Sequence, residues 1–69
     1  MSETRTFSVP DMSCEHCRRR ITEALEQTAG VTAVAVDLAK KLVTVTADTE
    51  TGTLIAAIDT AGYDAKLSS

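Results

Sequence analysis

The chain has 69 residues, of which 43% are hydrophobic and 25% are charged, and its formal net charge is −3. This composition is typical of a globular protein, and the length predicts a single domain over residues 1–69. The acidic balance argues against nucleic-acid binding, because the three consecutive arginines have no aromatic residue among them, and no apolar run approaches the ~20 residues that span a bilayer.

The cysteine usage points to a reducing compartment. The amino terminus lacks the apolar core of a secretory signal, and a disulfide between Cys14 and Cys17 would close only a very short loop. We therefore expect a cytoplasmic protein whose thiols stay reduced, which leaves metal binding or redox chemistry for the two cysteines.

The first half of the chain predicts a strand followed by a helix. Residues 4–9 alternate apolar and polar side chains, and Pro10 ends this strand because proline lacks the N–H that a strand ladder needs. Residues 15–29 place apolar side chains at helical spacing and form an amphipathic helix. Ser13 is the expected N-cap of this helix, and Gly30 is its expected left-handed C-terminal cap.

The second half predicts two strands, a helix and a last strand. Residues 31–38 and 42–47 alternate and face one core, and the polar link 39–41 makes them a hairpin. Residues 53–61 form the second helix, which Gly62 closes, and residues 64–67 are long enough for a short strand. The order predicts an α+β fold, the ferredoxin-like βαββαβ sandwich with a four-stranded antiparallel sheet and two helices on one face.

The motif Met12-Ser13-Cys14-Glu15-His16-Cys17 holds both cysteines and the only histidine, between the first strand and the first helix. Thiolates three positions apart at a helix start lie on one face and can converge on a single ion, and Cys17 is expected to be the more buried sulfur. The unpaired N–H groups and the positive end of the helix dipole favour thiolate over thiol, which argues against a pair of inert cysteines. With only two sulfur donors the site is open, which suits Cu(I) and suits Zn(II) poorly.

The pattern Met12-x-Cys14-x-x-Cys17, with Gly62-Tyr63 near the carboxyl end, resembles the heavy-metal-associated domain, and most closely the bacterial copper chaperones of the CopZ type. The resemblance covers nearly the whole chain and implies the same fold. It also implies a soluble Cu(I) metallochaperone that delivers copper by ligand exchange to a copper-transporting P-type ATPase. Asp11 stands where the family usually has glycine, which leaves the loop shape and the metal preference open.

Two further residues of the motif are candidates for auxiliary roles. Met12 either packs inward to support the loop or serves as a third soft ligand, and methionine is a common filler of core gaps. The resemblance implies the packing role too. His16 is rotated by about 100° from Cys17 around the helix and should face solvent. Its alternatives are to tune thiol ionisation or to bind an ion shared with a second molecule in a metal-bridged homodimer.

Outside the motif, the topology brings Tyr63 to the end of the sheet that holds the cysteines. Its ring either fills the core or approaches the thiolates, and the resemblance implies that it shields the metal there. The arginine run 18–20 is either a solvated helix face or a contact for a transient partner.

A thiol–disulfide enzyme is the competing class, because Cys-x-x-Cys after a strand is typical of redox proteins. Here Glu15-His16 replaces the Gly-Pro common between redox cysteines, and Pro10 is the only proline, so none remains to lie opposite the site in cis. We therefore predict no enzymatic activity. A metal-binding regulatory domain of a heavy-metal ATPase and a Zn(II) or Hg(II) carrier stay open. Zinc would need a carboxylate such as Asp11 or a second chain, whereas mercury accepts two thiolates.

Overall fold

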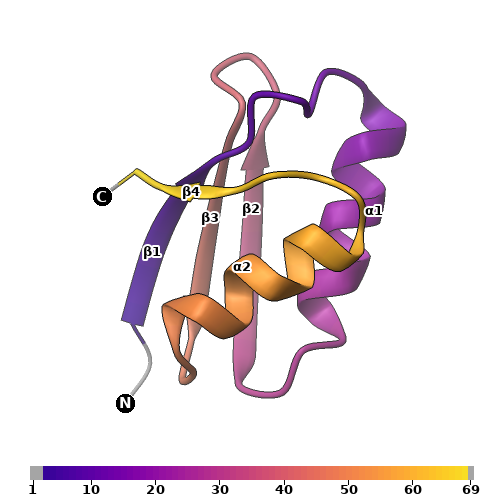
Figure 1. Cartoon of the computed structure of the whole chain (residues 1–69). Coiled ribbons are helices and arrows are strands. Elements are labelled where there is room, and N and C mark those ends of the chain that lie inside the picture. Colours follow the sequence, from indigo (N-terminus) through magenta and orange to yellow (C-terminus); the bar gives the residue numbers. More distant parts are fainter. Residues whose placement is uncertain (1–2, 69) are drawn as a thin grey trace.

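A computed structural model describes residues 3–68 and contains the predicted order of elements (Figure 1). They are β1 (Glu3–Ser8), α1 (Glu15–Glu26), β2 (Val31–Asp37), β3 (Leu42–Ala47), α2 (Thr51–Thr60) and β4 (Lys66–Leu67). The strands form one antiparallel sheet in the order β2-β3-β1-β4, and both helices cover one of its faces. The ferredoxin-like α+β fold predicted from the sequence is confirmed.

Both helices, β1, β3 and the segment after β1 form the core, and β2 packs partly buried side chains against it. The strand β3 alternates buried and half-buried residues and Phe7 of β1 is buried, so one face of the sheet packs under the helices. Each helix turns two aliphatic side chains toward that face, and the segment after β1 adds two more buried residues. The core residues, each at most 1% exposed, are Phe7, Val9, Met12, Ile21, Leu25, Val43, Val45, Ala47, Leu54 and Ile58.

The predicted end of α1 is wrong by three residues. The helix stops at Glu26, because Thr28 donates its N–H to the Leu25 carbonyl in a tightened last turn and its hydroxyl to the Ala24 carbonyl at 2.9 Å. Gly30 does have the predicted positive φ, of 92°, but it lies beyond the helix cap. It leads the chain into β2, where its carbonyl accepts a hydrogen bond from the N–H of Asp48 at 2.8 Å.

The loop between β1 and α1 lies at the same end of the sheet as the β2–β3 hairpin turn (Figure 1). Val9 donates its N–H to the carbonyl of Lys41 at 2.9 Å, which ties the loop to the hairpin. Met12 then donates to the Val9 carbonyl at 3.0 Å and buries its side chain completely. The start of α1 is therefore anchored to the core immediately before Cys14. None of the helices within residues 3–68 is long and apolar enough to cross a membrane.

Candidate metal-binding site

The N-cap of α1 is Cys14, so the prediction that Ser13 caps this helix is wrong. Cys14 has extended backbone angles, φ −143° and ψ 164°, and its carbonyl accepts the first helical hydrogen bond from Arg18 at 3.1 Å. Its sulfur accepts a hydrogen bond from the backbone N–H of Cys17 at 3.4 Å. A sulfur thus occupies the place that a serine or aspartate oxygen usually fills at a helix start, where N–H groups and the helix dipole favour negative charge.

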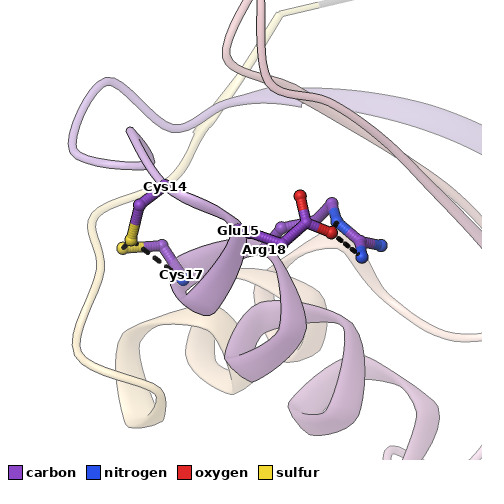
Figure 2. A network of polar contacts seen from close by, with 4 residues as sticks. All are labelled: Cys14, Glu15, Cys17 and Arg18. Atoms are coloured by element: carbon purple, nitrogen blue, oxygen red, sulfur yellow. Dashed lines mark hydrogen bonds and ion pairs between the residues drawn. The ribbon is translucent and has the colours of Figure 1, made fainter.

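The two sulfur atoms converge. The Sγ atoms of Cys14 and Cys17 lie 3.0 Å apart and share a hydrogen bond, and both cysteines are free thiols. Figure 2 shows both side chains pointing to the same side of the first helical turn. Cys14 is exposed and Cys17 is half-buried against the core, which confirms the predicted difference in burial. The pair can close on a single ion that arrives from solvent.

The environment of Cys17 favours its thiolate form. Its pKa is lowered to about 7, mainly because its sulfur hydrogen-bonds to the side chain of Cys14 and next because it hydrogen-bonds to the side chain of Tyr63. The backbone groups of Ser13 and Cys14 lower this pKa further, and desolvation opposes them. The lowered pKa favours the thiolate, which is the form that binds a metal.

Tyr63 reaches Cys17 through the turn that ends α2. Gly62, with φ 98°, donates its N–H to the Asp59 carbonyl at 2.9 Å, and Tyr63 donates to the Ile58 carbonyl at 3.3 Å. This Schellman pattern confirms that Gly62 closes the helix. The Tyr63 ring packs against the core while the pKa of its hydroxyl is raised, first because of its hydrogen bond to Cys17. Tyr63 thus fills the core and approaches the thiols at once.

Met12 and His16 lie where the sequence predicts them. Met12 is fully buried, which confirms that its side chain packs inward beneath the loop. His16 is exposed, as expected from its position around the helix. Within residues 3–68 there is no group of three or more His, Cys, Asp or Glu residues that could hold a metal ion. The structure brings the two sulfurs together here as candidate donors.

An ion pair that was not predicted from the sequence lies next to the two cysteines in the first turns of α1. Arg18 donates from Nε to Glu15 Oε1 at 2.7 Å and makes a second contact through Nη2, on the side of the helix away from the sulfurs (Figure 2). This contact lowers the pKa of Glu15 and raises that of Arg18. The pair could have been predicted from the sequence, because residues of opposite charge three positions apart on a helix are neighbours. Arg19 and Arg20 are exposed.

Fold and site together define a class: a small ferredoxin-like domain that presents two thiols at the start of its first helix. The chain belongs to the heavy-metal-associated domain family, whose model matches residues 6–64.

Named relatives fall into three groups. The chain is 38% identical over 65 residues to the copper chaperone CopZ of Staphylococcus haemolyticus, covering 90% of this chain and 96% of that protein. It is 35% identical over 63 residues to copper-transporting ATPase 1 of Rhizobium meliloti, a match that covers 88% of this chain and 8% of the ATPase. The crystal structure of oxidised MerP from Ralstonia metallidurans superposes with a TM-score of 0.95 at 30% identity, with both chains fully covered.

Proposed function

We propose that this protein is a metallochaperone that binds Cu(I) through Cys14 and Cys17 and delivers it to the metal-binding domain of a copper-transporting P-type ATPase. The observation that carries the proposal is the convergence of two sulfurs, 3.0 Å apart, at an accessible helix start. Two soft donors in an open site match the low coordination that Cu(I) accepts, whereas a structural Zn(II) site takes four ligands. The likeness to CopZ over nearly the whole chain supports the same assignment.

The proposed transfer proceeds by ligand exchange. A cysteine thiolate of the acceptor binds the ion while both carrier sulfurs still hold it, which makes a three-coordinate intermediate. One carrier sulfur then leaves and takes up a proton, and a second acceptor thiolate replaces the other carrier sulfur. The ion keeps its oxidation state and is never free in solution. Exposed Cys14 is the sulfur that an acceptor can approach, and the core-packed Cys17 holds the ion from the protein side.

In this function, residues 1–69 would form one heavy-metal-associated domain that works in the cytoplasm, where thiols stay reduced. The match to a short part of a copper-transporting ATPase supports the type of acceptor, because the donor and acceptor sites would then be built alike. Copper would pass between two similar pairs of cysteines, so its direction would follow the relative affinities of the two sites.

The test is anaerobic Cu(I) binding by Cys14→Ser and Cys17→Ser in competition with a chromogenic chelator. Serine at position 14 keeps a side-chain acceptor at the N-cap, so this variant should fold and still lose tight binding. Undiminished affinity in either variant would contradict the proposal. The same competition repeated with Zn(II) and Hg(II), with stoichiometry and oligomeric state recorded, separates a copper carrier from a zinc or mercury carrier and from a metal-bridged dimer.

A further inference from the structure

The two edges of the sheet differ in length. β4 forms one edge with only Lys66–Leu67, whereas β2 forms the other with the seven residues Val31–Asp37. An edge strand presents main-chain N–H and C=O groups with which a further strand can pair, and natural proteins often block such an edge with lysine or proline. β2 contains neither residue. Beyond the register shift between Val31 and Ala33, β2 is therefore a regular edge that another strand can join.

The side chains of β2 suit a pairing that covers them. Ala33 and Ala35 are exposed and small, so they leave the neighbouring backbone accessible. Val34 and Val36 are half-buried and pack against the rim of the core. The only charged residue of the strand is Asp37, at its end. A second strand beside β2 would therefore cover two valines without burying a charge in the middle of the contact.

One side of α1 extends this edge. The helix packs on β2 (Figure 1), and its other side turns toward α2, where Arg20 and Glu23 line a hollow together with residues of that helix. Arg18, Thr22 and Glu26 follow one another at intervals of four residues, so they form a row along α1. This row points away from α2 and toward the β2 edge of the molecule.

The row has bonding capacity that the single molecule does not use. The hydroxyl of Thr22 is buried and makes no hydrogen bond, although a buried hydroxyl normally has a partner. Glu26 is exposed and takes part in none of the ion pairs found within residues 3–68. Arg18 is paired with Glu15, but a guanidinium group has five N–H donors and can hold a second carboxylate. The row thus has a positive end, a hydroxyl at its centre and a negative end.

The row and the strand have their centres at about the same height. The Val31 N–H donates to the Thr28 carbonyl at 3.3 Å, so these two residues mark a common level between α1 and β2. Val34 lies three residues further along β2, roughly 7–10 Å from that level when the register shift is included. Thr22 lies six residues back along α1, about 9 Å from the same level. A twofold axis through Val34 and perpendicular to the sheet would therefore pass near Thr22.

We infer that two copies of this chain associate through antiparallel pairing of their β2 strands about such an axis, which joins the two four-stranded sheets into one. The two α1 helices then run antiparallel, with Arg18 of each copy opposite the partner's Glu26. The two Thr22 residues meet at the centre, where rotation about χ1 lets their hydroxyls bond to each other. The Cys14–Cys17 sites lie at opposite ends of the helix pair. The dimer therefore forms without a metal ion and leaves both sites open.

The first experiment is analytical ultracentrifugation of the reduced, metal-free protein at increasing concentration. We expect the average mass to rise from 7.3 kDa toward twice that value. Amide hydrogen exchange followed by NMR at low and high concentration then locates the contact. Every second amide of β2 should exchange more slowly at the high concentration, because alternate N–H groups of an edge strand point outward. A protein that stays monomeric up to about 1 mM, or a dimer whose β2 amides exchange at an unchanged rate, would overturn the inference.

A charge exchange tests the pairing of the two helices. Glu26→Arg should weaken the dimer about tenfold, because arginines then face each other at both ends of the helix pair. Adding Arg18→Glu to the same chain restores opposite charges and should recover most of the affinity. Glu23→Arg is the matched control: it changes the net charge by the same amount at an exposed residue of α1 on the side toward α2, and it should dimerise like the wild-type protein. Equal weakening in Glu26→Arg and Glu23→Arg, or no recovery in the double variant, would contradict this geometry.

Cys14→Ser separates this dimer from one that is bridged by metal or sulfur. The exposed side chain of Cys14 lies outside the β2 contact, so this variant should dimerise with the wild-type affinity in the absence of metal. A variant that is monomeric under these conditions would show that the copies associate through their cysteines, and the inference would be wrong.

Discussion

Cys14 serves the site in two ways, as a sulfur donor and as the N-cap of α1. Its sulfur accepts a hydrogen bond from the backbone N–H of Cys17, and its hydrogen bond with the Cys17 sulfur is the main cause of the lowered pKa of Cys17. A serine cap would satisfy the same N–H group but would offer a hard oxygen to a soft ion. In the proposed function, one side chain would therefore both cap the helix and bind the metal.

At this scale we predict how Cys17 titrates. Its pKa of about 7 should rise most in Cys14→Ala, which removes the main hydrogen bond, and less in Tyr63→Phe, which removes the second one. Because the folded pKa is lower than that of an unfolded cysteine, the thiolate stabilises the fold at pH values above the unfolded pKa, and this contribution is lost as the pH falls through about 7. The ¹³Cβ shift of Cys17, followed by NMR against pH, measures each pKa.

Cys14→Ser is the control for that series, since its hydroxyl can still donate to the Cys17 sulfur, and it should lie between the wild-type protein and Cys14→Ala. A Cys17 pKa that is the same in all four proteins would show that these hydrogen bonds do not control its ionisation.

The elements themselves were largely predictable, and their ends were not. Apolar periodicity locates both helices and the first three strands, because burial on one face imposes it. The last strand, whose two residues are exposed, was expected only because residues 64–67 are long enough for one. Helix caps depend on backbone angles, which cannot be read directly from a sequence. Ser13 and Cys14 are adjacent candidates for the N-cap of α1, and Cys14 is the one with the extended backbone angles of an N-cap. The last strand shrinks from the expected residues 64–67 to Lys66–Leu67, because only those two residues pair with β1.

Replacing each of the three glycines by alanine tests how strongly the local backbone requires glycine. Gly30→Ala should be the most destabilising, by at least ~2 kcal/mol, because φ is +92° and an added Cβ would lie 2.8 Å from the carbonyl oxygen of Asp48. Gly62→Ala should cost about 1 kcal/mol, since φ is +98° but the space is open. Gly52→Ala should stabilise α2 by roughly 0.5–1 kcal/mol.

Urea unfolding of the three variants, monitored by circular dichroism, gives the free energies of unfolding. The order of the three variants matters more than the individual values. Equal losses for Gly30→Ala and Gly62→Ala would mean that the backbone angle alone decides, and that the close approach of the Asp48 carbonyl is relieved at no cost.

At the scale of the whole molecule, the fully buried core includes neither of the two cysteines. The ten buried residues come from both helices, from β1 and β3, and from the loop after β1, and neither sulfur donor is among them. Met12, the one motif residue in this core, holds the loop in place from below. The spacing of the apolar residues and of the cysteines in the sequence was enough to predict that the core and the sulfur donors are separate. The contact of Tyr63 with Cys17 depends on the folded arrangement.

We therefore predict that the metal-free protein is folded, and that copper adds stability to an existing site. This contrasts with small zinc domains, where metal binding supplies the folding free energy. With free Cu(I) buffered at about 1,000 times the dissociation constant, loading should add ~4 kcal/mol and raise the melting temperature by roughly 15–30 °C. Calorimetry of the reduced protein with and without buffered Cu(I) measures both states. Cys17→Ser should melt cooperatively and show no such shift, whereas a metal-free wild-type protein without a cooperative transition would mean that the ion is needed to complete the fold.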